Sequence, residues 1–170
     1  MYFKLVYNLI EIIISHSKQA LLLVLFNQFF VSVPMTILAF DGLKLRGIFL
    51  RDVPSFPRVF IEVYLCSFMY EIFFYYSHRL MHHKFLYKYV HKVHHQWTAP
   101  IAITAMYSHP VEHIFVNIWA VSAGTIIMGS HIIVFWLWIT LLLLSTLGDH
   151  SGYHIPFLHS SEYHDFHHLK

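Results

Sequence analysis

Histidines gather in four short motifs whose spacing is suited to metal binding. Twelve of the sixteen histidines fall within residues 78–95 and 150–168. Neutral imidazole is a common ligand of first-row metals, and side chains three or four residues apart share one face of a helix. Each motif therefore predicts a helix face that presents several imidazoles together. The motifs are His78-Arg-Leu-Met-His82-His83, His91-Lys-Val-His94-His95, His150-Ser-Gly-Tyr-His154 and His164-Asp-Phe-His167-His168.

Ten of these imidazoles are predicted metal ligands. One ion of four to six coordination cannot use ten, so the set indicates two ions. Nitrogen ligands alone are compatible with iron, zinc or copper. The predicted ligands are His78, His82, His91, His94, His95, His150, His154, His164, His167 and His168.

Other polar residues near the motifs are candidates for supporting roles. Glu71 lies two helical turns before His78 on the same face, which suits either an acceptor for an imidazole N–H or an ordinary interface position. His83 lies off the face shared by the first motif, and Asp165 lies within the last, so we expect both in outer positions. His109 and His113 are expected near the ligands or the substrate. The ungrouped histidines, expected to be ordinary surface or interface residues, are His16, His131 and His159.

The composition is that of an integral membrane protein. Hydrophobic residues make up 57% of the 170-residue chain and charged residues only 12%, whereas soluble domains carry about 25% charged residues. The net charge of +2 comes from scattered basic residues, which gives no indication of nucleic-acid binding. Cys66 is the single cysteine, which excludes an internal disulfide. No glycine-rich nucleotide motif is present, so an oxygenase built on this chain would take its electrons from a separate carrier.

Four apolar segments predict an all-α protein with about four transmembrane or re-entrant helices. The last two are slightly short and are separated only by Gly129-Ser130-His131, so we expect a helical hairpin. A hairpin returns the chain to the side it left, which brings residues 150–168 to residues 78–95. We also expect an interfacial helix at 3–14, a kink at Pro34 and polar loops at 41–58 and 97–110. The apolar segments are residues 20–40, 59–77, 111–128 and 132–147.

The distribution of basic residues predicts that the histidine side faces the cytoplasm. With that orientation seven basic residues are cytoplasmic and four are not, in agreement with the positive-inside rule. The seven are Lys4, Lys18, Arg79, Lys84, Lys88, Lys92 and Lys170, and the four are Lys44, Arg46, Arg51 and Arg58.

Together the motifs resemble those of the fatty acid hydroxylase superfamily, the membrane di-iron oxygenases with His-x3-His-His and His-x2-His-His boxes. The resemblance covers residues 71–168. Within it, the segments around His78, His91, Ser108 and His150 are similar to those of the C-4 methylsterol oxidase branch. It divides the chain into an N-terminal membrane helix and loop at 1–58 and a hydroxylase-type domain at 59–170. Members of the family continue past the last histidine box, so the domain is expected to be incomplete at its C-terminus.

The resemblance implies the chemistry as well. The ten histidines would hold two non-haem iron ions, O2 would be the co-substrate, and a C–H bond of a sterol C-4 methyl group or a fatty acyl chain would be hydroxylated. Electrons would come from cytochrome b5 or a b5-like carrier with its NAD(P)H-dependent reductase. The place would be the endoplasmic reticulum membrane, in lipid or sterol biosynthesis. Desaturases use similar boxes, so hydroxylation and desaturation both stay open.

Two other functions are compatible with the same residues. A metal-handling membrane protein would use the histidines, but transport needs ionisable groups at the middle of the bilayer, and residues 111–147 have few. A short, inactive form that acts through interactions is the other alternative. Metal flux in sealed vesicles would distinguish a metal-handling protein from an enzyme, and a turnover assay with reductase, cytochrome b5 and candidate lipids would distinguish an inactive form from an enzyme.

Overall fold

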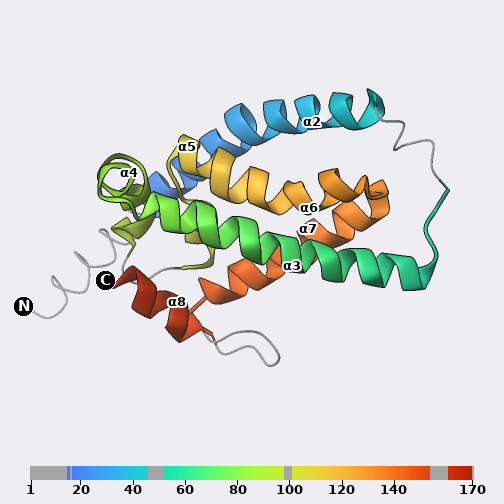
Figure 1. Cartoon of the computed structure of the whole chain (residues 1–170). Helices are drawn as coiled ribbons and strands as arrows, with labels where there is room; N and C mark the ends of the chain where they lie inside the picture. Colours follow the sequence, from blue (N-terminus) through green and yellow to red (C-terminus); the bar gives the residue numbers. More distant parts are fainter. Residues whose placement is uncertain (1–14, 16, 46–51, 98–100, 154–160, 170) are drawn as a thin grey trace, which may run out of the picture.

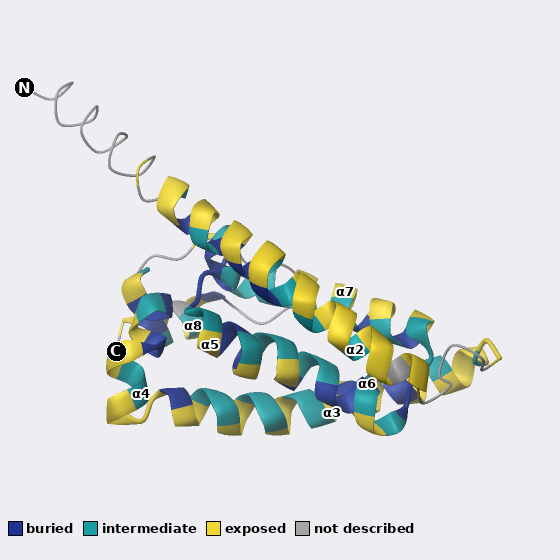
Figure 2. Ribbon diagram, turned by 90° about the horizontal axis from the view of Figure 1, so that it is seen from above, coloured by how far each residue is buried: buried dark blue, intermediate teal, exposed yellow. Residues whose placement is uncertain are grey.

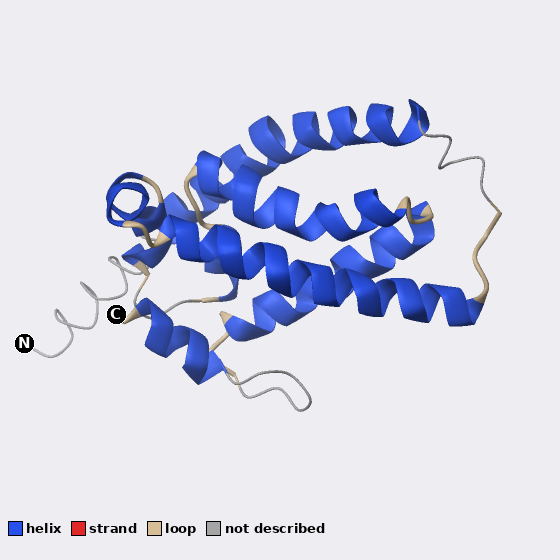
Figure 3. Ribbon diagram, viewed as in Figure 1, coloured by secondary structure: helices blue, strands red, loops and turns tan. Residues whose placement is uncertain are grey.

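The computed structural model describes residues 15, 17–45, 52–97, 101–153 and 161–169, apart from the side chains of Leu43 and Asp165. The described part is helical and has no strand (Figure 3). Four of its helices are long and apolar enough to cross a membrane, which confirms the predicted fold class. They are Ser17–Gly42, Phe56–Met81, Pro110–Met128 and Ile132–Asp149. The expected interfacial helix at 3–14 lies outside the described residues.

The first membrane helix contains a π-helical segment. This segment, η1 (Asn27–Ser32), continues directly into α2 (Val33–Leu45), and the Val33 N–H bonds the Gln28 carbonyl five residues back. Pro34, where we expected a kink, lies just after the π-helical turn. A proline in a helix removes one backbone donor and crowds the preceding turn, and a wider turn accommodates that locally. Helix α2 runs on to Leu45, so the predicted loop at 41–58 is wrong at its first residues.

The second membrane helix, α3 (Phe56–Met81), carries the first histidine motif. It begins after Ser55, which is extended, and Pro57 occupies the first turn, where a missing N–H costs nothing. The helix runs without a break through His78, as expected, and His82 ends it as the C-cap. Its start at Phe56 lies inside the loop predicted for 41–58. The predicted division between residues 58 and 59 falls in this first turn and stays a prediction.

The predicted hairpin is present. Its first arm comprises α5 (Pro110–Glu112), the π-helical η5 (His113–Trp119) and α6 (Ala120–Met128), and its second arm is α7 (Ile132–Asp149). Gly129 closes the first arm with a left-handed φ of 62°, and the Ser130 N–H bonds the Thr125 carbonyl, as in a glycine-terminated helix. The two arms run antiparallel in Figure 1, which returns the chain to the end of α3 that carries the histidines.

Small residues let α3 and α6 approach each other closely. A Cβ atom added to Gly124 would lie 3.2 Å from the Cα of Cys66, and Ala120 and Ala123 beside it are buried. Close backbone approach through small residues is how membrane helices associate, because lipid provides no hydrophobic force between them. Large apolar side chains such as Phe30 and Phe60 are instead exposed, as expected for a lipid-facing surface. Exposed positions recur along the ribbon of α2 in Figure 2.

Short helices collect at one end of the bundle. Helix α4 (Lys84–Tyr89) follows α3 and is seen end-on in Figure 1, so it crosses the direction of the membrane helices. The 3₁₀ helices η3 (His91–Gln96) and η4 (Ala102–Met106) follow, so the predicted loop at 97–110 is partly helical. Helix α8 (Ser161–His168) packs against the end of α7. The described residues of all four histidine motifs therefore lie at this end.

Candidate metal centre

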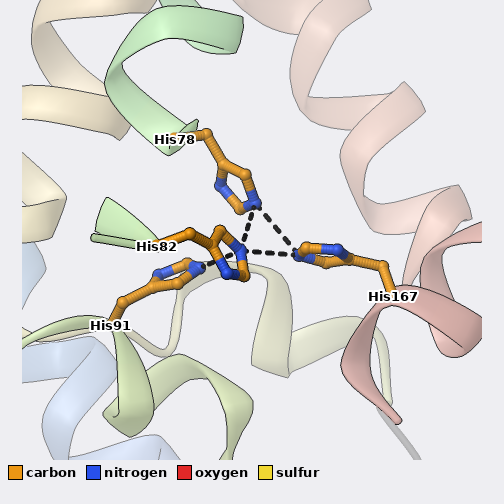
Figure 4. A group of neighbouring side chains, drawn as sticks. All are labelled: His78, His82, His91 and His167. Atoms are coloured by element: carbon orange, nitrogen blue, oxygen red, sulfur yellow. Dashed lines mark hydrogen bonds between the residues drawn. The ribbon is translucent and has the colours of Figure 1, made fainter. Parts of the chain in front are cut away.

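Four imidazoles from three elements form the first histidine group. His78 and His82 come from the end of α3, His91 from the start of η3 and His167 from α8. Their Nε2 atoms point toward one another, as Figure 4 shows. The Nε2 atom of His78 lies 3.0 Å from that of His167 and 3.2 Å from that of His82. The Nε2 atom of His82 lies 3.1 Å from that of His91.

Four further imidazoles form the second histidine group: His94, His150, His164 and His168. The Nε2 atom of His164 lies 2.8 Å from the Nε2 atoms of both His150 and His168. The ring of His94 packs over that of His168 with centroids 4.6 Å apart. Helix α8 contributes to both groups, because His164 and His168 face one way and His167 the other.

His95 lies between the two groups. Its Nε2 atom is 3.1 Å from that of His91, which places it beside the first group. Its ring is also stacked on that of His168, in the second group, with centroids 4.8 Å apart. The structure thus brings together nine of the ten predicted ligands, and the two groups are direct neighbours.

The donor set fits two first-row metal ions. Nitrogens on one ion with bonds of about 2.1 Å are about 3.0–3.4 Å apart for angles of 90–109°. The Nε2 separations of 2.8–3.3 Å within the groups are close to this range. Each group offers four nitrogens within 4.8 Å of one another, which is enough for one ion with room for a further ligand.

Outer acceptors fix the orientation of three of the imidazoles. The Nδ1–H of His91 donates to Oε1 of buried Glu112 at 2.9 Å. The Nδ1–H of His94 donates to the Tyr107 carbonyl at 3.0 Å, and that of His150 to the Thr146 carbonyl at 2.9 Å. A proton on Nδ1 leaves the lone pair on Nε2, the atom directed into each group. Each bond therefore selects the tautomer that binds metal.

Burial keeps these imidazoles neutral. Burial, assisted by neighbouring imidazoles, lowers the pKa values of His91, His95 and His164 to about 3. Burial also lowers the pKa of His94 to about 4, although Glu112 and the Tyr107 carbonyl act in the opposite direction. Only neutral imidazole binds metal, so the ligands are ready for metal at physiological pH.

Two predicted residues fall outside what the structure describes: His154 and the side chain of Asp165. The expectation that His150 and His154 share one helix face is wrong for a local reason. Helix α7 ends at Asp149, and Gly152 has a φ of 71°, so the chain leaves the helix before residue 154. The second motif also differs in form, since η3 is a 3₁₀ helix, but it still directs three imidazoles inward.

The predicted supporting residues lie at varied distances from the groups. Glu71 is exposed and hydrogen-bonds no described imidazole, although it lines a hollow beside His78. His83 is exposed at the start of α4, outside both groups. His109 accepts the Val111 N–H at 3.2 Å and so caps α5, and buried His113 bonds Ser32 and Asn117.

Sequence reasoning missed Glu112 as the acceptor for His91. A signal was present, because Glu112 is the single acidic residue between Glu71 and Asp149 and opens an apolar helix. A carboxylate buried in such a segment is costly unless it has a partner. The carbonyl acceptors Tyr107 and Thr146 had no signal of this kind, since any residue offers a carbonyl.

A bundle of four membrane-length helices with two histidine groups at one end has the arrangement of a histidine-box membrane protein. Residues 63–170 match the family model "Fatty acid hydroxylase". The match covers more than half of the chain, and the chain therefore belongs to the fatty acid hydroxylase family.

Curated relatives extend this result. The chain is 44% identical over 154 residues to human "Fatty acid hydroxylase domain-containing protein 2", covering 90% of this chain and 46% of that protein. It is 35% identical over 157 residues to rat "Methylsterol monooxygenase 1", covering 86% of this chain and 53% of the relative. A rice "Very-long-chain aldehyde decarbonylase" is 35% identical over 165 residues, covering 91% of this chain and 61% of the relative.

The chain thus spans about half the length of the curated relatives it matches. No solved structure matches it. The names of these relatives are those of a hydroxylase-domain protein, a sterol monooxygenase and an aldehyde decarbonylase, and the four membrane-length helices make this chain a multi-pass membrane protein in broad class.

Proposed function

We propose that this chain is the catalytic domain of a membrane monooxygenase that uses two iron ions to hydroxylate a C–H bond of a lipid. The lipid is a sterol with a C-4 methyl group or a fatty acyl chain. The observation that carries the proposal is the pair of histidine groups, whose Nε2 atoms converge while Glu112, Tyr107 and Thr146 hold three of the rings from outside. The names of the relatives, a fatty acid hydroxylase domain-containing protein and a methylsterol monooxygenase, support the lipid substrate.

The reaction balances as R–H + O2 + 2 e⁻ + 2 H⁺ → R–OH + H2O. Iron held by the two groups supplies the redox chemistry that activates O2. His78, His82, His91 and His167 would hold one ion, with His95 beside them, and His94, His150, His164 and His168 the other. The contribution of the chain is to hold the imidazoles neutral and to aim their Nε2 atoms.

A hollow beside α3 offers the substrate a route to the first group. It has a volume of about 470 Å³, and its lining combines two candidate ligands, His78 and His82, with the rings of Phe74 and Tyr75. Arg79 and Glu71 complete it, and the Arg79 guanidinium donates to the Tyr75 hydroxyl at 2.7 Å. A lipid lying along α3 would reach this hollow from the bilayer with its apolar part on the aromatic rings.

Electrons would come from cytochrome b5 or a b5-like carrier, with its NAD(P)H-dependent reductase. Residues 72–111 contain no acidic residue, and Lys84, Lys88 and Lys92 are all exposed. Such a positive surface suits an acidic carrier. Tyr87 of α4 connects this surface to the site, since its ring lies 5.8 Å from that of His82 and 5.6 Å from that of His95.

The proposed place is the endoplasmic reticulum membrane, with the metal centre facing the cytoplasm. Among the described residues, Arg79 and three lysines of the segment 84–92 lie at the metal end, whereas Lys44 and Arg58 lie at the opposite ends of their helices. Positive residues favour the cytoplasmic side.

Isotope labelling tests the proposal. Membranes containing the chain, a b5-type carrier and its reductase are supplied with NADPH, ¹⁸O2 and either a 4-methylsterol or a long-chain acyl lipid. We expect one ¹⁸O atom in a hydroxylated product, and no product with His94→Ala. An iron-loaded chain that gives no labelled lipid with either substrate class would contradict the proposal.

A further inference from the structure

A buried polar network connects the first membrane helix to the start of the hairpin. Asn27 is completely buried, and its Nδ2–H donates to the Ser108 carbonyl at 2.8 Å. Five residues along the same helix, the Ser32 hydroxyl lies 2.8 Å from Nε2 of His113. Asn117 donates to Nδ1 of His113 at 3.2 Å, so the Nε2–H of His113 donates to Ser32.

Both π-helical segments take part in this network. Asn27 and Ser32 are the first and last residues of η1, and His113 and Asn117 belong to η5. The two segments pack against each other. π-Helical turns are rare and are found frequently at functional sites. Here two π-helical segments contact each other through polar side chains, which indicates that the contact has a role beyond helix packing.

Each contact ends next to a residue that orients a candidate metal ligand. His113 directly follows Glu112, the acceptor for His91 of the first group. Ser108 directly follows Tyr107, whose carbonyl accepts from His94 of the second group. The first membrane helix thus reaches both groups along two routes: from Ser32 to His91 and from Asn27 to His94. Asn117 links the two routes, since its Nδ2–H groups donate to Nδ1 of His113 and, at 3.5 Å, to the Ser108 hydroxyl.

The burial cost argues for a specific role. An amide at membrane depth costs free energy unless its groups are paired, and Oδ1 of Asn27 has no hydrogen-bond partner among the described residues. An apolar residue would pack here without that cost. The amide is therefore better explained by its one strong bond, to the carbonyl of Ser108, than by a general contribution to helix packing.

We propose that Ser32 and Asn27 are positioning residues of the metal centre, each for a different ion. Ser32 holds the segment of Glu112 and thereby the ring of His91 in the first group. Asn27 holds the segment of Tyr107 and thereby the ring of His94 in the second group. This inference rests on the proposed function, because both require the two histidine groups to bind iron.

Mössbauer spectra of the ⁵⁷Fe-loaded chain in detergent test the two routes separately. Inequivalent ions give two quadrupole doublets, and Glu112→Gln identifies the doublet of the first group. We expect Ser32→Ala to shift that same doublet and Asn27→Leu to shift the other one. Each variant should lower iron affinity by about tenfold, at the low end of what outer partners of metal ligands contribute.

Controls separate positioning from folding. Ser32→Thr keeps the hydroxyl and should restore the wild-type spectrum, and Thr36→Ala removes an exposed hydroxyl one turn further along the same helix and should change nothing. Wild-type spectra and iron affinity in both Ser32→Ala and Asn27→Leu would overturn the inference. Equal shifts of both doublets in either variant would also overturn it. Lack of iron in the wild-type chain would instead contradict the proposed function.

Discussion

His91 and Glu112 are joined by a hydrogen bond of 2.9 Å in a site where their side chains are 0% and 4% exposed. They lie 21 residues apart, one in the second histidine motif and the other in the first turn of a membrane helix. The bond ties the metal centre to the membrane bundle. Its loss would free the His91 ring to rotate and to change its tautomer.

Replacing Glu112 should therefore weaken metal binding. We expect Glu112→Ala to lower iron affinity by about ten- to a hundredfold, the usual effect of removing an outer acceptor, and Glu112→Gln to lower it less because the amide oxygen still accepts. Equilibrium titration with Fe²⁺ under anaerobic conditions measures this. Exposed Glu71→Ala is the matched carboxylate control, and equal affinities in Glu112→Ala and Glu71→Ala would refute the role of Glu112.

Alanine substitutions should divide the histidines into two classes. We expect loss of at least one iron ion when a candidate ligand is replaced, because a coordination position opens. His131→Ala should keep the metal, since His131 accepts the Ile133 N–H as the N-cap of α7 and lies outside both groups. His16→Ala and His159→Ala should also keep it. Metal analysis of the purified variants measures this. Full iron retention in the alanine variants of the candidate ligands would contradict the ligand set. The candidate ligands to replace are His91, His94, His95, His164, His167 and His168.

The metal-free chain should lose stability in acid. His91, His95 and His164 have pKa values near 3 in the folded chain, whereas exposed histidine titrates near 6.5. Between these values the unfolded state binds more protons than the folded state, so the free energy of unfolding falls as the pH falls from about 6.5 toward 3. Thermal unfolding in detergent at pH 7.5 and pH 5 measures it. An equal Tm at both would contradict the burial of neutral imidazoles.

The helix contact at Gly124 should tolerate little added volume. A methyl group there would approach the Cys66 backbone at 3.2 Å, and a larger side chain would push α3 and α6 apart. We expect Gly124→Val to destabilise the chain by about 1–3 kcal/mol and to displace His78 and His82 with α3. Gly42→Ala is the control, because nothing lies within 4 Å of its added Cβ. Equal free energies of unfolding for Gly124→Val and Gly42→Ala would contradict a close contact between α3 and α6.

Local sequence spacing predicted much of this arrangement. Apolar length predicted the four membrane helices, and the hairpin at Gly129 predicted that the histidine motifs would meet. The structure brings nine of the ten predicted ligands together, while metal binding itself stays a prediction. The motifs were predictable because ligands on one turn are close in sequence as well as in space.

The outer contacts were not predictable in the same way. Glu112 reaches His91 across 21 residues, and Asn27 and Ser32 each reach their partners across 81. No periodicity links such positions, and they depend on how the helices pack. The helix expected through His150-Ser-Gly-Tyr-His154 was wrong for a different reason: the pattern has helical spacing, but α7 ends at Asp149 and Gly152 then takes a left-handed conformation.

Iron stoichiometry tests the central claim most directly. The chain is purified from iron-replete cells without oxygen, and iron per chain is measured by mass spectrometry against quantitative amino-acid analysis. Two converging histidine groups predict about two iron ions per chain, and fewer in His78→Ala of the first group and in His150→Ala of the second. A wild-type chain that holds no iron, or that keeps its iron unchanged in both variants, would contradict the account.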